Sequence, residues 1–255
     1  PQFGYAADST TPVTLFTTPS DGTKPTATGA FSTGAVLTLT TTGSNKLLQT
    51  TAYAFTIADL RNPSSVVAAA TVAVETQDAA GNICDGPTST ATPQIAVGTI
   101  GGTKSFVGTV KTPGVKGNHL LSFSTVGQVP KAGGKVLLLL PASFTEKPTA
   151  QFSMETPVAS FTTPGGNTVV RTTAFSSRTL TITMSDVAVA SLAVPQSFAV
   201  VIQVTNVRTP SSIVATASTS TITTQDAAGK NVDTVAAVVT DAITVGTIVG
   251  TKTFV

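Results

Sequence analysis

Residues 223–233 read TTQDAAGKNVD, and residues 75–85 read ETQDAAGNICD. In each stretch an aspartate can cap a type I turn, and the glycine three residues later can take the positive φ that follows such a turn. These residues are Asp78 and Gly81 in one copy, and Asp226 and Gly229 in the other. Strand-like runs flank both stretches, so each is predicted to be a β-hairpin.

The two copies extend well beyond the hairpin. Upstream, LRNPSSVVA (60–68) matches VRTPSSIVA (207–215), and TPVTLFTTP (11–19) matches TPVASFTTP (156–164). Downstream, VGTIGGTKSFV ends at Val107 and VGTIVGTKTFV ends at Val255. The offset is about 145 to 148 residues throughout, which is typical of tandem copies of one module. We therefore expect two domains, residues 1–107 and 108–255.

Alternation of apolar and hydroxyl side chains predicts strands nearly everywhere. Runs such as AVLTLTT (35–41), RTLTITM (178–184) and STSTITT (218–224) have a period of two, which puts one face on a core. Pro63 and Pro210 cannot continue a ladder, so they are predicted to end strands. The fold expected is all-β, with two tandem immunoglobulin-like β-sandwiches and no helix of ten residues or more.

Residues 108–150 have no counterpart in the first copy. They include two predicted strands, Leu120–Ser124 and Lys135–Leu140, and the unbroken apolar run of the second predicts burial on both faces. We expect about nine strands in the full module and about seven in the first, which would lack its opening strands. Its hydrophobic face would then form a groove that another segment fills, either from the same polypeptide or from a neighbouring subunit. The alternative is that the seven strands close on themselves as a minimal sandwich. The residues predicted to line this groove are Phe31, Leu37, Leu39, Phe55 and Ile57.

The composition argues against several functional classes. Charged residues are 10% of the chain, against about 25% in a typical soluble domain, and 50 residues are threonine. A surface this poor in charge suits burial in an assembly, and its Thr and Ser rows suit O-linked glycans. The scattered Lys and Arg residues disfavour nucleic-acid binding. No apolar run approaches the ~20 residues of a membrane span, and any secretory leader would have been removed or would lie upstream.

The residue inventory does not suggest catalysis. The single histidine, His119, has no counterpart in the first copy and is expected to be a surface or strand-end residue. The single cysteine, Cys84, aligns with Val232 and is expected to be a small buried side chain. No glycine pattern or Cys/His cluster predicts a cofactor or a zinc site. Asp78, Asp85, Asp226 and Asp233 recur at the hairpins; calcium binding is conceivable, but turn capping explains them more simply.

A longer pattern in the second copy carries a resemblance. The run VPKAGGKVLLLLPASF (129–144) is followed by RTPSS and then by TTQDAAGKNVD. This arrangement resembles tandem repeats of large surface proteins of protists, with similar modules in some bacterial surface proteins. The matching residues are Pro130, Gly133, Gly134, Lys135, Pro141, Phe144, Pro210, Ser211, Ser212, Asp226, Gly229 and Asp233. The resemblance implies immunoglobulin-like sandwiches, an extracellular or cell-surface location and no catalytic residue.

Two functional hypotheses follow from these observations. The first is a non-enzymatic structural subunit of an extracellular filament or surface coat, whose partners are other copies of itself or adjacent repeats of a longer chain. The second is a surface adhesin or ligand-binding module displayed on a stalk of repeats. No nucleic acid, membrane span or cofactor belongs to either hypothesis.

Overall fold

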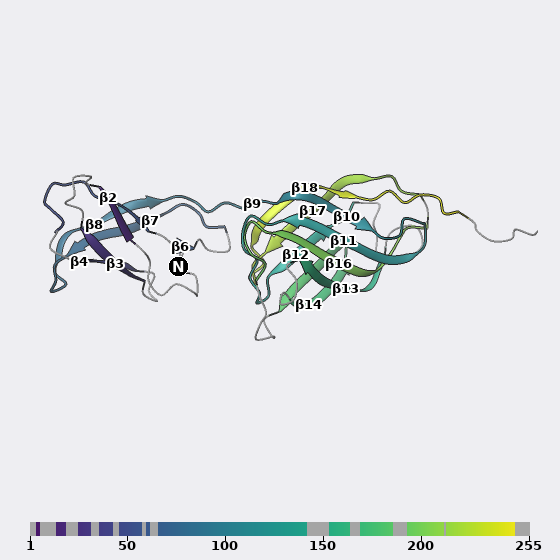
Figure 1. The fold of residues 1–255 in the computed structure, drawn as a ribbon, viewed down its shortest axis with the longest axis horizontal. Coiled ribbons are helices and arrows are strands. Elements are labelled where there is room, and N and C mark those ends of the chain that lie inside the picture. The colour runs from purple at the N-terminus through teal and green to yellow at the C-terminus, as the bar shows by residue number, and fades with distance from the viewer. Residues whose placement is uncertain are drawn as a thin grey trace, which may run out of the picture. The chain divides into compact units, whose positions relative to one another are not determined.

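The computed structural model describes residues 4–5, 14–18, 25–31, 36–42, 46–57, 60–61, 66–141, 153–163, 169–185, 193–211 and 213–247. Among these residues there are strands, turns and single bridges but no helix, so the all-β prediction is confirmed (Figure 1). The chain divides into two compact units. One comprises Pro1–Pro63 with Val67–Ile95, and the other comprises Ser64–Val66 with Ala96–Val255.

The second unit contains a ten-stranded sheet. Its strands follow the order β13–β16–β11–β10–β18–β17–β12–β15–β14, with β9 also paired to β18. Neighbouring strands are antiparallel, except that β9 and β10 run parallel to β18. The strands are β9 (Gly98–Thr99), β10 (Gly101–Gly108), β11 (Lys116–Ser124), β12 (Lys135–Leu139), β13 (Ser153–Thr163), β14 (Val169–Ser176), β15 (Thr179–Ser185), β16 (Ala199–Arg208), β17 (Ala217–Gln225) and β18 (Asn231–Thr240).

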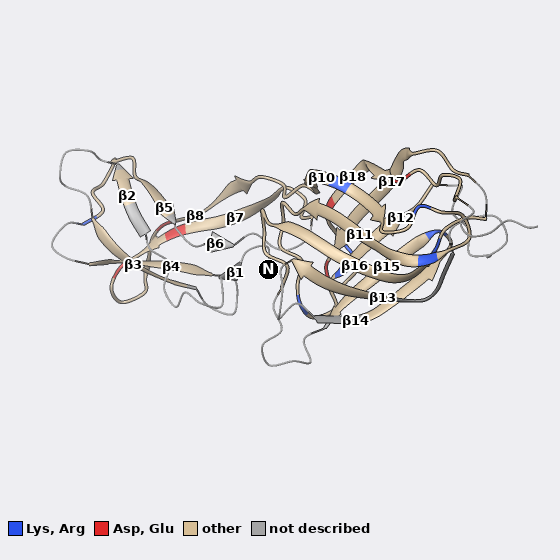
Figure 2. Ribbon diagram, turned by 45° about the vertical axis from the view of Figure 1, so that its right-hand side comes forward, with Lys and Arg blue, Asp and Glu red and all other residues tan. Residues whose placement is uncertain are grey.

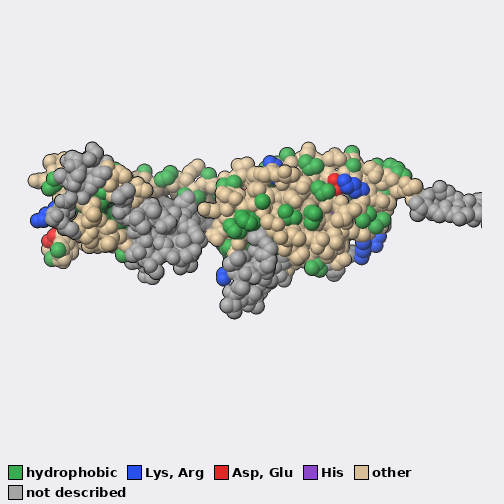
Figure 3. All heavy atoms as spheres, in the orientation of Figure 1, with side chains coloured by type: hydrophobic (Ala, Val, Ile, Leu, Met, Phe, Trp, Pro, Cys, Tyr) green, Lys and Arg blue, Asp and Glu red, His purple; other side chains and the backbone are tan. Residues whose placement is uncertain are grey.

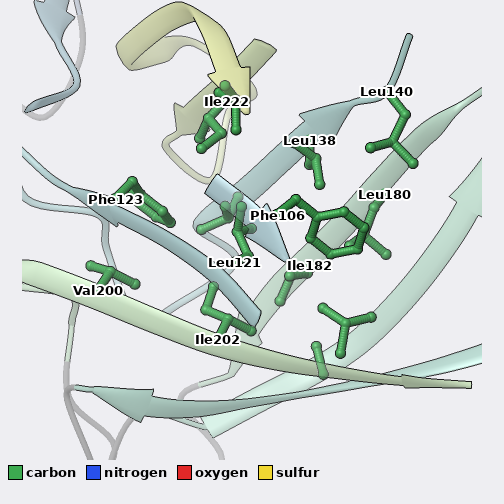
Figure 4. Close-up of a cluster of buried hydrophobic side chains, with 14 of the residues drawn as sticks. Phe106, Leu121, Phe123, Leu138, Leu140, Leu180, Ile182, Val200, Ile202 and Ile222 are labelled. Carbon is green, nitrogen blue, oxygen red and sulfur yellow. The ribbon is translucent and has the colours of Figure 1, made fainter. Parts of the chain in front are cut away.

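The two ends of this sheet come together. The first and last strands of the order, β13 and β14, are consecutive in the chain, and the Ala159 amide donates a hydrogen bond to Thr173 Oγ1 at 3.2 Å. Side chains from both halves of the order fill one hydrophobic core, in which Phe106, Leu121 and Ile202 face Leu138, Leu180, Ile182 and Ile222 (Figure 4). This arrangement is consistent with the β-sandwich class.

Strand β12 corrects one expectation. Val136 and Leu138 are fully buried, whereas Leu137 is half-buried and Leu139 is 39% exposed. The strand lies between β15 and β17 and buries one face only, so the prediction that its apolar run is buried on both faces is wrong. Successive side chains of a pleated strand point to opposite faces, so alternate residues of this apolar run are buried and the others are more exposed.

The second unit begins earlier than the repeat suggested. It starts at Ala96 rather than at Gly108, because β9 and β10 pair with β18 and β11 within its sheet. Phe106 on β10 is only 1% exposed and belongs to the core of this unit. The VGTIGGTKSFV segment, which closes the first sequence copy, is therefore an inner strand of the second unit.

The first unit has a different organisation. Its described strands form four separate two-stranded sheets, β1–β6, β2–β5, β3–β4 and β7–β8. The strands are β1 (Gly4–Tyr5), β2 (Thr14–Thr18), β3 (Thr26–Phe31), β4 (Leu37–Thr42), β5 (Ala54–Ile57), β6 (Leu60–Arg61), β7 (Ala70–Gln77) and β8 (Ile83–Thr92). Pairs of strands bury little on their own, and an isolated hairpin is only marginally stable in water.

Candidate functional site

The hairpin of each repeat is closed by an aspartate, as the turn chemistry predicts. Asp78 Oδ1 accepts hydrogen bonds from the amides of Ala80 (2.9 Å) and Asn82 (2.8 Å). In the second copy, Asp226 Oδ1 accepts from the Lys230 amide at 2.9 Å. The hydrogen bond from the Asn82 side chain, followed by those from the backbone, lowers the pKa of Asp78 below its ordinary value. Both carboxylates are thus committed to capping a turn.

The two turn glycines adopt the backbone conformation that the sequence predicts. Gly81 has a φ of 85° and Gly229 a φ of 79°. Each donates its amide to the carbonyl of the capping aspartate, at 3.0 Å and 3.1 Å. Open space surrounds the position of a Cβ at either glycine, so backbone conformation alone favours glycine there.

Asp233 makes contacts outside its own hairpin, which the sequence did not suggest. Its side chain is fully buried and accepts hydrogen bonds from the amides of Val126 and Gly127, each at 3.0 Å. Its own amide donates to Thr224 Oγ1 at 3.0 Å. The carboxylate also lies against Gly98 on the parallel strand β9, so closely that a Cβ at that position would clash with it. Asp233 therefore ties the hairpin to β9 and to the loop after β11.

The repeat counterpart of Asp233 lies in a different environment. Asp85 on β8 is exposed, and its Oδ2 accepts a hydrogen bond from Thr76 Oγ1 at 2.8 Å. Among the described residues, Asp85 therefore bonds a side chain of its own hairpin, whereas Asp233 bonds the loop after β11.

Calcium binding by these aspartates receives no support from their geometry. Asp78 and Asp226 bond the amides of their own turns, and Asp233 bonds the amides of a loop far away in sequence. The described part of the chain contains no group of three or more His, Cys, Asp or Glu side chains that could hold a metal ion. Calcium prefers six to eight oxygen ligands, which these separate carboxylates do not provide.

Cys84 is exposed, so the expectation that it is buried is wrong. Its counterpart Val232 is buried on β18, at 8% exposure. The difference follows from the neighbours: β18 has strands on both sides, while β8 pairs with β7 alone among the described residues. Ile83, Val72 and Val74 on the same hairpin are 56%, 38% and 52% exposed.

His119 is also placed differently from its prediction. It is buried on β11 at 1% exposure, opposite Gly108, and its ring stacks on Phe106 with centroids 4.8 Å apart. Burial lowers the pKa of His119 to about 4, although the nearby charge of Asp241 acts in the opposite direction. The imidazole is therefore neutral at physiological pH and serves the core of the second unit.

The groove residues of the first unit are only partly covered. Phe55 is 45% exposed, while Leu37 and Leu39 are half-buried. Phe55 packs against Phe16, which is buried, with ring centroids 5.6 Å apart. The side chains of Phe31 and Ile57 lie outside the described residues, as does Pro63. Pro210 is buried just after β16 ends at Arg208, as expected for a strand end.

The described surface carries few charges. Lys, Arg, Asp and Glu take up little of the ribbon of either unit (Figure 2). The ion pair in the described residues joins Lys111 to Asp241 at 3.2 Å. On the visible face of the second unit, hydrophobic side chains lie in small groups among uncharged polar ones (Figure 3). Within the described ranges, no helix is long and apolar enough to cross a membrane.

Comparisons with protein-family models, with curated protein sequences and with solved structures found no match. The candidate site is accordingly defined by geometry alone. It is the outer edge of β8 with Asp85, which corresponds to the edge of β18 that β9 and β10 cover in the second unit.

Proposed function

We propose that this protein is a structural subunit of an extracellular filament or surface coat. Its modules would be immunoglobulin-like β-sandwiches joined in series, each completed by a strand from a neighbouring segment. The observation that carries the proposal is the position of β9 and β10. The segment that closes one sequence copy is an inner strand of the following unit, between β11 and β18.

The energetics of the opening strands support this proposal. In the second unit, β10, β11 and β12 bring five large apolar side chains into the core: Phe106, Leu121, Phe123, Val136 and Leu138. At about 1.5 to 3 kcal/mol each, their burial contributes roughly 8 to 15 kcal/mol. The whole stability of a domain is only about 5 to 15 kcal/mol. The described strands of the first unit include no counterpart of these three strands, so completion by a further segment would decide its stability.

The surface chemistry favours the same function. Unpaired strand edges with exposed apolar side chains promote pairing with further strands. Among the described strands, the β7–β8 hairpin has such edges, together with exposed Val74 and Ile83. The low charge fits a surface covered by neighbouring subunits or by O-linked glycans, and the resemblance to tandem surface repeats favours an extracellular location.

Imaging and sedimentation of the purified chain test this function. We expect the sedimentation coefficient to rise with protein concentration and negative-stain micrographs to show linear or lattice-like assemblies. A chain that stays monomeric across the micromolar range, with no ordered assembly at the highest concentration, would contradict the proposal.

A further inference from the structure

The segment Val245–Val255 repeats a strand whose binding place is known. It is identical to residues 97–107 except at Val249 and Thr253, which replace Gly101 and Ser105. The earlier copy forms β9 and β10, which lie parallel to β18 in a defined register. The paired residues are Gly98 with Asp233, Thr99 with Thr234, Ser105 with Val239 and Phe106 with Thr240.

The repeat counterpart of β18 is β8. Both strands follow the same capped turn, and both pair with the preceding strand of the hairpin. In the second unit β9 and β10 cover the other edge of β18, while β8 pairs with β7 alone among the described residues. Every side chain from Ile83 to Ala91 is exposed. β8 therefore presents the edge that corresponds to the covered edge of β18, and no described strand pairs with it.

We propose that residues 245–255 of one molecule pair in parallel with β8 of a second copy of this chain. The inference rests on the proposed function, because it names the strand and the edge that join one subunit to the next. Transfer of the observed register pairs Gly246 with Asp85, Thr247 with Gly86, Thr253 with Ala91 and Phe254 with Thr92. Backbone hydrogen bonds would supply affinity, as in other cases of strand addition.

Asp85 and Gly246 give this pairing a specific register. Gly98 lies so close to the Asp233 carboxylate that a Cβ would clash, and Gly246 repeats that glycine in the second segment. An Asp85 carboxylate turned from Thr76 into the orientation of Asp233 would meet the Cβ of any residue other than glycine at this position. A shift of the segment by one residue would set Val245 or Thr247 against Asp85, so the glycine fixes the alignment.

Pro87 is compatible with the pairing. A proline in a strand lacks the amide needed for a ladder and is tolerated at edges and bulges. Its counterpart is Val235. The pairing of β18 with β9 ends at Thr234 and its pairing with β10 begins at Val239, so Val235 lies between the two. The parallel ladder is interrupted there, so the missing amide of Pro87 removes no hydrogen bond from the transferred register.

The exposed Cys84 provides a direct test. One residue before the pair Gly246–Asp85, the register sets Val245 opposite Cys84. Adjacent strands lie ~4.8 Å apart, within the range of about 4.4 to 6.8 Å between the Cα atoms of a disulfide. The donor chain is Val245→Cys with Cys84→Ser, and the acceptor is the unmodified chain. Only contact between two molecules can link the new thiol of the donor to Cys84 of the acceptor.

Mild oxidation of the mixed chains, followed by mass spectrometry of the linked peptides, gives the readout. We expect the mixed disulfide as the main product. An off-register donor, Thr251→Cys with Cys84→Ser, should yield only the background of chance collisions. Adding Gly246→Val to the Val245→Cys donor should abolish the mixed disulfide, and so should deleting residues 248–255. Unchanged thermal unfolding of the second unit would show that both variants still fold.

The outcomes separate this inference from the proposed function. If the unmodified chain assembles but the in-register and off-register donors react equally, the strand assignment is wrong and the structural function stands. If the unmodified chain does not assemble and no mixed disulfide forms, both are overturned. A mixed disulfide that survives Gly246→Val and the deletion would also refute the assignment, because the contact would not depend on the segment.

Discussion

At the scale of single residues, the two copies of one aspartate show how neighbours set the role of a side chain. Asp233 is buried and accepts two backbone amides, whereas Asp85 at the same repeat position is exposed. A buried carboxylate costs free energy unless hydrogen bonds compensate it. Asp233 is compensated by the loop that follows β11, a loop with no counterpart among the described residues of the first unit.

Replacing Asp233 with asparagine is therefore expected to destabilise the second unit by roughly 2 to 3 kcal/mol. Hydrogen bonds to a charged acceptor are lost, and the NH₂ group of the new side chain faces a backbone N–H donor. Urea unfolding followed by circular dichroism measures this change. Asp85→Asn is the matched control, and in dilute solution it should change stability by less than about 1 kcal/mol because the side chain is exposed. Equal effects of the two substitutions would contradict the role assigned to Asp233.

The turn glycine of the second unit gives a second residue-scale prediction. Gly229→Ala should cost about 1 to 2 kcal/mol, because its φ of 79° is strained for any residue with a Cβ. Gly101→Ala is the control, since that position also has open space for a Cβ but no positive φ. The difference in urea midpoint between the two variants isolates the backbone strain. A Gly229→Ala chain as stable as the Gly101→Ala chain would refute it.

His119 predicts a pH dependence of stability. Its pKa is about 4 in the folded chain, below its ordinary value of 6.5. As the pH falls, His119 therefore takes up a proton in the unfolded chain before it does so in the folded chain. The free energy of unfolding is at its full value above pH 6.5 and decreases as the pH falls towards 4. The loss approaches about 3 kcal/mol at the lower limit. Urea titrations between pH 7 and 4.5 should show this slope, and His119→Leu should flatten it; an unchanged slope would place its origin elsewhere.

At the scale of strands and hairpins, the sequence predicted most of what is local. Period-two patterning located β4, β15 and β17, and the Asp–Gly turn located both hairpins. Repeat alignment could not locate the domain boundary, because a tandem repeat has the same period wherever its unit is taken to begin. The boundary at Ala96 depends on the pairing of β10 with β18, a contact between segments more than a hundred residues apart.

Burial was the other property that local patterns predicted poorly. Cys84 and Val232 occupy the same position in the two equivalent hairpins, yet only Val232 is buried. The same limit applies to His119, whose ring is buried because β10 places Phe106 against it. The signal that could have found the site was the VGT motif itself, whose glycine recurs at residues 98 and 246.

The assignment of β10 to the second unit predicts the effect of truncating its main core residue. Phe106→Ala should destabilise that unit by about 3 to 5 kcal/mol, because the side chain is 1% exposed and its loss leaves a cavity. Differential scanning calorimetry of the whole chain would show the loss in the transition of the second unit. Val72→Ala, on an exposed strand of the first unit, should have little effect on the transition of the second unit. A Phe106→Ala change confined to the first unit's transition would contradict the assignment.

At the scale of the whole molecule, strand addition would let a chain whose residues do not suggest catalysis build an assembly. The chain has 10% charged residues, and the described strands of the first unit form pairs with uncovered edges. A segment that can complete such a unit recurs at residues 245–255. Strand addition between copies would then join subunits through backbone hydrogen bonds and buried apolar side chains, with no enzyme and no covalent bond.

Hydrogen–deuterium exchange at β8, measured over a series of protein concentrations, tests this central claim most directly. Amides that gain a strand partner exchange more slowly, so protection near the paired residues 85–86 and 91–92 should rise with concentration. The same amides should stay unprotected in a chain that lacks residues 248–255, while β18 stays protected in both. Exchange at β8 that does not change with concentration, in a chain that nevertheless assembles, would contradict the account.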